Sequence, residues 1–372
     1  MKSQKEKIVV AMSGGVDSSV AAALLVKKGY DVVGMFAVNY EGQNKLGNSC
    51  WRGDYEDALR VCAKLGIKLL RLNFAEEYKQ KVLAYTYQEY EKGKTPNPDV
   101  MCNKFIKFDV WLKKIKELGY DKIATGHYAC LRQNFSNIAP RLFLARDKNK
   151  DQTYFLHQLN QTQLKDTLFP LDKYTKKQVR KLAQKFDLAT QNKEESMGIC
   201  FVGEVAINQF LKDKVKYSPG NIVLGGGEII GTHTGLPFYT IGQKSSVLSS
   251  QFSINRKNEP LFIVGKNLTK NELVVGFEDD PLLFKTEIKL ANFHWISELE
   301  PKLPLQCQFR LRHRQELQTG TLYRHSKQNE SQKKYILKAR QPQRAVTAGQ
   351  FAVIYKKRLF QGFECLGGGE ID

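Results

Sequence analysis

The sequence lacks any pair of closely spaced cysteines and any apolar run long enough to cross a membrane. None of its seven cysteines forms a CxxC motif, which argues against a zinc site. A membrane-spanning helix needs about 20 consecutive apolar residues, and no run approaches that length. The short basic stretch 1–7 leads directly into apolar sequence and leaves no room for a signal or transit peptide. We therefore expect a cytoplasmic protein that has no membrane partner and keeps its cysteines as thiols.

Acidic residues are too few to balance the basic ones. The 372 residues include 58 Lys and Arg against 38 Asp and Glu, which gives a formal net charge of +20. This excess indicates a polyanionic partner, of which nucleic acid is the first candidate. A helix predicted over 176–186, with Thr175 as its N-cap, carries several of the cations. That helix has two readings, a solvated face or a surface that follows a nucleic-acid backbone.

A glycine-containing turn near the N-terminus has a clear chemical signature. Residues 8–12 predict a strand, Ser13-Gly14-Gly15-Val16-Asp17-Ser18 predicts a turn, and the alanines and leucines that follow predict a helix. Gly14 and Gly15 permit backbone conformations in which several amide N–H groups point into one concavity. At a helix N-terminus such a concavity binds anions, and Asp17 would hold a divalent cation between itself and a phosphate.

This turn is not a Walker motif, because it lacks the lysine and the four-residue spacer between glycines. It resembles the PP-loop of ATP pyrophosphatases, whose signature Ser-Gly-Gly-x-Asp-Ser matches residues 13–18. Members of that group cleave ATP between the α and β phosphates and adenylate an oxygen of their substrate. The resemblance implies that ATP and Mg²⁺ bind at this turn.

Strand-length and helix-length segments alternate through the first part of the chain. This alternation predicts an α/β fold with a doubly wound parallel sheet and ligand loops at the carboxyl ends of its strands. The expected strands are 8–12, 31–38, 67–72 and 122–125, and the expected helices after the first are 54–65, 75–92 and 105–118.

Farther along the chain the pattern changes to short apolar runs separated by glycine turns. From about residue 282 helical periodicity is absent, which predicts a small β-barrel. We expect three domains: a PP-loop catalytic domain over 1–212, a central β-rich domain over 213–281 and a C-terminal β-barrel domain over 282–372.

Two cysteines have unusual neighbours. Cys102 follows Asn97-Pro98-Asp99 and is expected in a loop that two prolines stiffen and that leads into the helix predicted at 105–118. A thiol near a helix N-terminus and a lysine, here Lys104, has its thiolate form favoured. Cys200 is expected at the edge of another loop. Taken singly, each would be read as a buried structural cysteine.

Together with the PP-loop, these cysteines belong to a series of motifs that occur in a specific order. The motifs are Asn97-Pro98-Asp99, Cys102-Asn103-Lys104, Thr125-Gly126-His127-Tyr128, Gly198-Ile199-Cys200-Phe201, Tyr239-Thr240-Ile241-Gly242-Gln243 and Cys365-Leu366-Gly367-Gly368-Gly369. In this order they resemble the bacterial tRNA-specific 2-thiouridylase family. The resemblance runs from the first predicted strand to the last residues.

The resemblance implies ATP-dependent transfer of sulfur to C2 of the wobble uridine of tRNA, after adenylation of the C2 oxygen. It assigns catalytic roles to Asp17, Cys102 and Cys200. Cys102 would be the nucleophile, and Cys200 would carry a persulfide from an upstream donor, a cysteine desulfurase or a sulfur-relay protein. Sulfur release would leave a Cys102–Cys200 disulfide, unless the persulfide attacks C2 directly.

Binding residues follow from the same resemblance. Those implied for ATP are Ala11, Met12, Ser13, Gly14, Gly15, Val16, Asp17, Ser18, Met35 and Gly126. Those implied for the target base are Asn97, Pro98 and Asp99, and those implied for the rest of the tRNA are His127, Lys150, Asp151, Gln152, Arg312, His313 and Gln350. We expect the protein to act as a monomer.

Three other functions fit parts of the sequence. Another PP-loop enzyme would adenylate a different tRNA base or a small metabolite. An iron–sulfur tRNA thiolase would hold a cluster on Cys102, Cys200 and a further ligand. A non-catalytic RNA-binding protein would keep the loop as an ATP sensor. A persulfide on Cys200 separates these functions, because only the 2-thiouridylase requires one.

Overall fold

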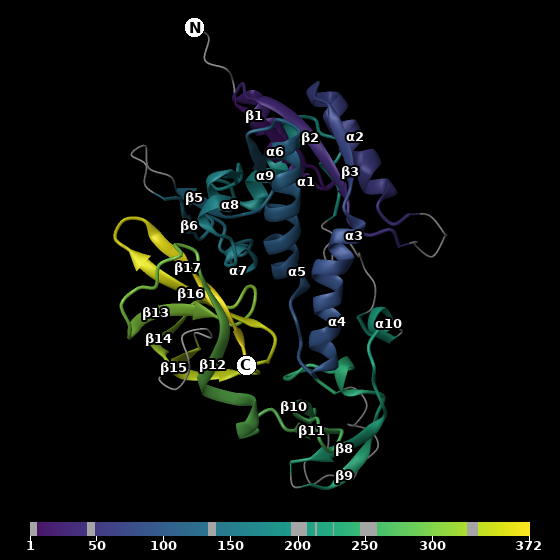
Figure 1. The fold of residues 1–372 in the computed structure, drawn as a ribbon, viewed down its shortest axis with the longest axis vertical. Helices are drawn as coiled ribbons and strands as arrows, with labels where there is room; N and C mark the ends of the chain where they lie inside the picture. The colour runs from purple at the N-terminus through teal and green to yellow at the C-terminus, as the bar shows by residue number, and fades with distance from the viewer. Residues whose placement is uncertain are drawn as a thin grey trace.

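The computed structural model describes residues 6–42, 49–132, 139–194, 207–212, 214–225, 227–245, 259–325 and 334–372. An α/β region at the top of Figure 1 is followed by a small β-sheet at the bottom and a β-barrel at the lower left. This architecture confirms the fold class predicted from the sequence. The predicted domain boundaries stay predictions.

The α/β region is built on a five-stranded parallel sheet of order β3-β2-β1-β4-β7. Its strands are β1 Lys7–Ala11, β2 Asp31–Val38, β3 Leu69–Asn73, β4 Lys122–Ala124 and β7 Thr167–Leu168. Strand order reverses at β1, with β2 and β3 on one side and β4 and β7 on the other. The loop after β1 therefore lies at the switch point where open α/β sheets bind ligands.

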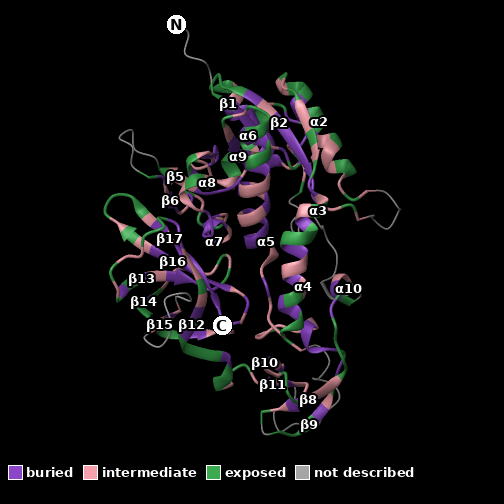
Figure 2. Ribbon diagram, viewed as in Figure 1, coloured by how far each residue is buried: buried purple, intermediate pink, exposed green. Residues whose placement is uncertain are grey.

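Small side chains bring helix α1, Val16–Lys27, close to the sheet. Val20, Ala21 and Ala22 are fully buried, and the purple segments of Figure 2 mark this core. Helix α2, Arg52–Leu65, ends at Gly66, whose φ of 67° gives the left-handed cap that the sequence predicted. α9, Lys176–Lys185, packs beside α1 and begins at Thr175, which forms a capping box with Gln178.

Two longer helical segments follow β3, and each contains a π-helix. The first comprises α3 Ala75–Tyr78, η1 Lys79–Leu83 and α4 Ala84–Glu91, and it ends near Gly93 as predicted. The second comprises α5 Pro98–Met101, η2 Cys102–Val110 and α6 Trp111–Glu117. The prediction of a loop at Cys102 is wrong, because Asn97 caps the helix and Pro98 occupies its first turn, where proline is favoured.

The short elements between β4 and the central sheet connect the α/β region to the rest of the chain. They are β5 Cys130–Arg132, β6 Arg141–Phe143, α7 Thr153–Leu156, α8 Gln161–Lys165 and α10 Ile207–Lys212. The described part of the chain contains no helix long and apolar enough to cross a membrane.

The central sheet has the order β10-β11-β8-β9 and its own apolar core. Its strands are β8 Gly220–Leu224, β9 Ile229–His233, β10 Phe262–Asn267 and β11 Glu272–Gly276. The central sheet touches the end of α4, where the Lys266 ammonium group donates to the Gly93 carbonyl at 2.9 Å. Burial lowers the pKa of Lys266 to about 8.

The barrel closes through antiparallel pairing of its first and last strands, β12 and β17. Its strands are β12 Phe284–Trp295, β13 Leu305–Arg310, β14 Gln318–Arg324, β15 Tyr335–Arg344, β16 Phe351–Arg358 and β17 Gly362–Ile371. Gly367 has a φ of 135°, and a Cβ there would lie 2.0 Å from the His294 carbonyl oxygen. The glycine motif near the C-terminus thus permits the close strand approach that closes the barrel.

The α/β region contributes strands to the barrel sheet, which the sequence did not predict. β6 pairs with β17 and β5 pairs with β6, so the two parts share one sheet. Two arginines, Arg141 of β6 and Arg358 of β16, pair with the buried carboxylate of Glu364. Backbone pairing and a shared ion-pair network hold the barrel against the α/β region.

Candidate functional site

The PP-loop is held in shape by its own serine hydroxyls. Ser18 Oγ accepts from the Ser13 amide at 3.2 Å and donates to the Gly15 carbonyl at 3.1 Å. Ser19 Oγ donates to the same carbonyl at 2.7 Å. These contacts fix the turn between β1 and α1, so the first amides of α1 are available to an anion.

Two glycines of the site are required by close backbone contacts. Gly14 has a φ of 72°, and a Cβ there would lie 2.2 Å from the Asp54 carbonyl oxygen. A Cβ at Gly126, in the loop after β4, would lie 2.7 Å from the Ser18 amide nitrogen. The loops after β1 and β4 therefore meet without intervening side chains.

The residues expected to bind ATP gather at the carboxyl end of β1. Ala11 lies opposite Met35 in the β1–β2 register, and the Met12 amide donates to the Met35 carbonyl at 2.8 Å. Gly126 reaches the same loop from β4. A turn at a helix N-terminus offers backbone amides to an anion, and phosphate binding at this turn stays a prediction.

The Asp17 carboxylate is the charged group at this loop, and it has two partners. Lys176 Nζ lies 2.7 Å from Oδ1 and 2.8 Å from Oδ2. The Tyr128 hydroxyl donates to Oδ1 at 2.8 Å. Sequence reasoning treated Lys176 as part of a solvated or RNA-facing helix and missed this contact. The sequence feature that singles out Lys176 is the Thr175 N-cap, because the cap makes Lys176 the first residue of α9.

No group of three or more potential metal-ligating side chains occurs among the residues that the structure describes. The Asp17 carboxylate would contribute one ligand to Mg²⁺. This fits the habit of Mg²⁺, which takes one or two carboxylates and completes its shell with phosphate oxygens and water.

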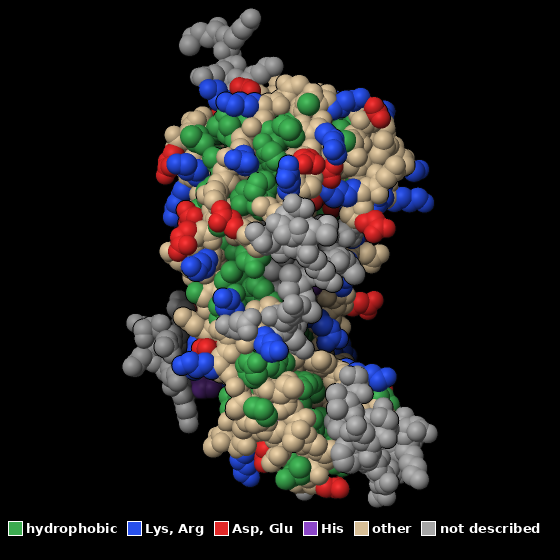
Figure 3. Space-filling view, turned by 90° about the vertical axis from the view of Figure 1, so that its right-hand side faces the viewer, with side chains coloured by type: hydrophobic (Ala, Val, Ile, Leu, Met, Phe, Trp, Pro, Cys, Tyr) green, Lys and Arg blue, Asp and Glu red, His purple; other side chains and the backbone are tan. Residues whose placement is uncertain are grey.

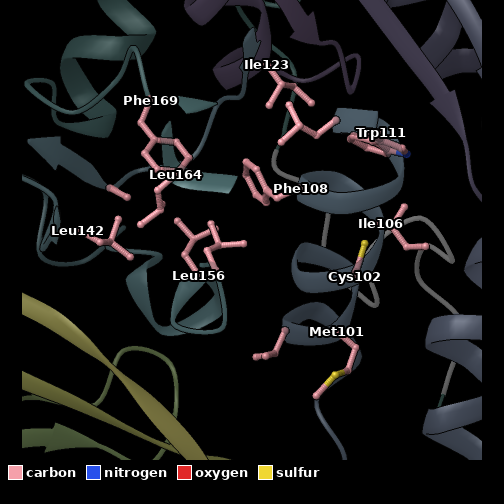
Figure 4. Packing of buried hydrophobic residues seen from close by; sticks show 14 of the residues in the cluster. Met101, Cys102, Ile106, Phe108, Trp111, Ile123, Leu142, Leu156, Leu164 and Phe169 are labelled. Atoms are coloured by element: carbon pink, nitrogen blue, oxygen red, sulfur yellow. The ribbon is translucent and has the colours of Figure 1, made fainter. Parts of the chain in front are cut away.

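Cys102 is fully buried in the core of the α/β region. Figure 4 shows it on the helix between Met101 and Ile106, within the apolar cluster. Met35, which is expected at the ATP site, belongs to the same cluster. Lys104 donates to Gln158 Oε1 at 3.1 Å, and burial lowers the pKa of its ammonium group. Cys200 lies outside the described residues.

The Asn97-Pro98-Asp99 segment is attached to the barrel. The Asn97 side-chain Nδ2 donates to Gln350 Oε1 at 3.3 Å, and Gln350 Nε2 donates to the Thr95 carbonyl at 2.9 Å. The Thr95 amide in turn donates to the Ala348 carbonyl at 2.9 Å. The structure thus brings together the expected base-contacting segment and Gln350, which are distant in sequence.

Asp151, one of the residues expected to contact tRNA, belongs to a buried ion pair that joins the α/β region to the barrel. Asp151 accepts from the Ala145 amide at 2.8 Å and from Thr153 Oγ1 at 2.7 Å. Arg310 of β13 donates to Asp151 at 2.7 Å, and the two side chains are 6% and 0% exposed. Since the Asp151 side chain is enclosed, it contributes to this region by holding the loop against the barrel.

Two residues next to this ion pair lie near the surface. Arg312 is exposed, and the His313 ring packs against Phe155 with ring centroids 4.6 Å apart and an interplanar angle of 40°. Burial, aided by the nearby charges of Arg314 and Lys150, lowers the pKa of His313 to about 4. His313 is therefore neutral near pH 7, so it offers a ring face and a hydrogen bond rather than a charge.

Two residues expected at the tRNA have structural contacts near the ATP loop. His127 is buried, shares a 2.8 Å hydrogen bond with Thr125 Oγ1, and has its pKa lowered by burial. Gln152 accepts from the Tyr128 amide at 2.9 Å. Tyr128 also binds Asp17, so the motif at 125–128 connects the ATP loop to the 150–152 segment.

Positive and negative side chains are mixed on the face of the molecule that Figure 3 shows. In the view of Figure 3, Lys and Arg side chains are spread among Asp and Glu side chains over the α/β region. The excess positive charge of the sequence therefore does not form one continuous patch on that face.

We predict that Arg310→Met lowers the free energy of unfolding by about 3 kcal/mol, because it leaves the buried Asp151 carboxylate without its cation. Urea unfolding followed by circular dichroism measures the loss. Arg52→Met is the control, since its i,i+4 pair with Glu56 is solvent-exposed, and about 0.5 kcal/mol is expected there. Equal losses for both variants would contradict the structural role of Asp151.

Family models match nearly all of the chain. A model described as the tRNA methyl transferase HUP domain matches residues 6–204. A PRC-barrel domain model of the same series matches 208–277, and an aminomethyltransferase beta-barrel domain model matches 285–371. A solved 4-thiouridine synthetase–RNA complex with bound ATP has a TM-score of 0.36 at 15% identity, covering 56% of this chain and 50% of that one. A likeness this slight supports no functional comparison.

Relatives are similar along their whole length. A tRNA-specific 2-thiouridylase MnmA of Geobacillus thermodenitrificans is 42% identical over 98% of this chain and 94% of its own. Proteins of the same name are 42% identical in Halalkalibacterium halodurans, over 99% and 95%, and 41% identical in Legionella pneumophila, over 99% and 99%. This identity spans all three parts of the fold, and the chain therefore belongs to the tRNA-specific 2-thiouridylase family.

Proposed function

We propose that this protein uses ATP to replace the C2 oxygen of the wobble uridine of tRNA with sulfur. The observation that carries the proposal is the meeting of the PP-loop, the Gly126 loop and the Asp17 carboxylate at the switch point of the parallel sheet. Full-length similarity to proteins named tRNA-specific 2-thiouridylase supports the choice of substrate.

The PP-loop would bind the phosphates of ATP. Amides at the start of α1 would donate to the phosphate oxygens, while the hydroxyls of Ser13 and Ser18 bond to each other and hold the loop. Met35 lies beside Ala11 on the neighbouring strand, and Gly126 lies against the loop. Asp17 would bind Mg²⁺, which neutralises the phosphates and favours departure of pyrophosphate. The uracil C2 oxygen attacks the α-phosphorus, the bond to the β-phosphate oxygen breaks, and pyrophosphate leaves with the electron pair.

The target base must leave the anticodon stack to reach this site, because the reacting oxygen is otherwise inaccessible. Asn97, Pro98 and Asp99 would contact the displaced base. The hydrogen bonds of Gln350 to Asn97 and Thr95 fix this segment from the barrel side, so the base pocket depends on the docking of two domains.

Cys200 would carry the sulfur to be transferred as a persulfide. In one route Cys102 attacks the inner sulfur of that persulfide, a Cys102–Cys200 disulfide forms, and the released sulfide displaces AMP from C2. In the other, the terminal sulfur adds to C2 and AMP leaves, after which Cys102 breaks the S–S bond and yields the same disulfide. Because Cys102 is buried, both routes require its helix to move when tRNA binds. The π-helix that begins at Cys102 is a geometry less stable than the α-helix and is frequent at functional sites.

The rest of the tRNA would contact Lys150, Gln152, Arg312 and His313. His127 and Asp151 are buried, and they would support these residues through structural hydrogen bonds. Arg312 and Lys150 would pair with phosphates, and neutral His313 would stack or form a hydrogen bond. The sheet that the barrel shares with the α/β region would hold these residues of the two domains in one arrangement.

Nucleoside analysis tests the proposal. Cells depleted of this protein are expected to lose 2-thiouridine derivatives at the wobble position and to accumulate the oxygen-containing forms, as measured by mass spectrometry. Re-expression should restore the thiolated nucleosides. Unchanged wobble 2-thiouridine, with loss of a different thionucleoside, would favour another PP-loop tRNA enzyme.

A further inference from the structure

The ammonium group of Lys176 is built into the ATP site. It contacts both oxygens of Asp17, and its side chain is 13% exposed. The neighbouring Lys177 is exposed. The two adjacent lysines of α9 therefore have different environments, and Lys176 is the one directed toward the PP-loop.

The scaffold around Lys176 holds its backbone in place. Its amide donates to Asp147 Oδ2 at 2.8 Å, while Thr175 and Gln178 form the capping box that starts α9. Helix α9 packs on α1, and Thr190 beyond α9 donates to Ser19 Oγ at 3.0 Å. The ammonium group is delivered to the loop by packed elements, which lowers the entropy cost of using it to bind a ligand.

Both carboxylate oxygens of Asp17 already have partners, so a divalent cation bound to either oxygen would lie close to the Lys176 ammonium group. Lys176 occupies both carboxylate oxygens and Tyr128 shares one of them. If Mg²⁺ takes one oxygen, repulsion between the two cations displaces the ammonium group. A displaced, largely shielded ammonium group is stabilised by another anion, and phosphates bound at the adjacent turn would supply one.

We propose that Lys176 is an ATP-binding residue that exchanges Asp17 for a β- or γ-phosphate oxygen when Mg·ATP enters the loop. This rests on the proposed function only in taking the PP-loop as the ATP site. The ammonium stays protonated, and it neutralises the negative charge that pyrophosphate gains from the breaking P–O bond. When pyrophosphate and Mg²⁺ have left, the Lys176–Asp17 pair re-forms.

Isothermal titration of the full chain with Mg·ATP and with AMP tests the exchange. Lys176→Met keeps the length of the side chain and removes its charge, so ATP affinity should fall about 10- to 100-fold while AMP affinity stays within about twofold. Lys177→Met, the matched control, should change neither. Lys176→Arg should recover most of the ATP affinity because it keeps the charge.

Two outcomes would overturn the proposal. Equal losses for ATP and AMP in Lys176→Met would mean that the lysine only maintains the shape of the loop, and unchanged ATP affinity would mean that it never leaves Asp17. Circular dichroism on the same samples verifies folding, and Lys176→Gln provides a second uncharged variant. Because the measurement needs neither tRNA nor a sulfur donor, its result is separate from the test of thiolation.

Discussion

Cys200→Ser is expected to abolish 2-thiolation while ATP and tRNA binding remain near those of the unchanged protein. A serine hydroxyl cannot carry a persulfide, so the sulfur supply ends even when the uridine is adenylated. A reconstituted reaction with tRNA, ATP and a cysteine-desulfurase sulfur source measures the loss. Mass spectrometry of the unchanged protein, incubated with the donor alone, should find an added sulfur on Cys200.

Controls for this experiment come from the other cysteines. Cys50→Ser should keep full activity, because Cys50 is exposed and lies outside the proposed chemistry. Cys102→Ser should still accept the persulfide on Cys200 but should not turn over. Normal thiolation by Cys200→Ser with the physiological donor would reject the proposed role of Cys200.

Asp17→Ala is expected to lower adenylation at least 100-fold with little change in tRNA affinity. The substitution removes the carboxylate proposed to hold Mg²⁺, and losing one such electrostatic contact commonly costs two to three orders of magnitude in rate. It also removes the two contacts that the Lys176 ammonium group makes with this carboxylate. Pyrophosphate release in the presence of tRNA measures adenylation, and filter binding measures tRNA affinity.

Two further variants make the Asp17 result specific. Asp31→Ala removes an exposed carboxylate at the start of β2 and should leave both measurements unchanged. Asp17→Asn keeps the size of the side chain and should behave like Asp17→Ala in adenylation. If the Asp17 variants released tRNA yet continued to adenylate, the assignment of the PP-loop to ATP would be wrong.

Local sequence was sufficient to predict those elements whose pattern lies within a single turn, strand or helix end. The run from Ile8 to Ser18 predicted a strand, a turn and a helix, and the structure confirms all three. Anion binding by the turn stays a prediction. β2 occupies the predicted residues 31–38, and Gly66 ends α2. These features depend on backbone preferences and apolar spacing within about ten residues, which the sequence displays directly.

Prediction failed where one residue had two local interpretations. Pro98 together with Pro96 predicts a stiffened loop, although proline also suits the first turn of a helix. The Asn97 side chain, which caps this helix, favours the second alternative. As a result Cys102 lies inside a helix and is buried, where a loop had been expected. Packing of Ile106 and Trp111 into the core favours the helical alternative.

The sequence by itself determined the PP-loop, the parallel sheet around it, the β-barrel and the family. These follow from short motifs and from the periodic spacing of apolar residues. Only the tertiary structure decided that Lys176 meets Asp17, that Arg310 meets Asp151 and that β6 joins the barrel sheet. Each of these contacts joins residues more than 150 positions apart. The residues around a charged side chain or a strand edge do not indicate which distant residue it contacts, so such pairs can be identified only from the folded structure.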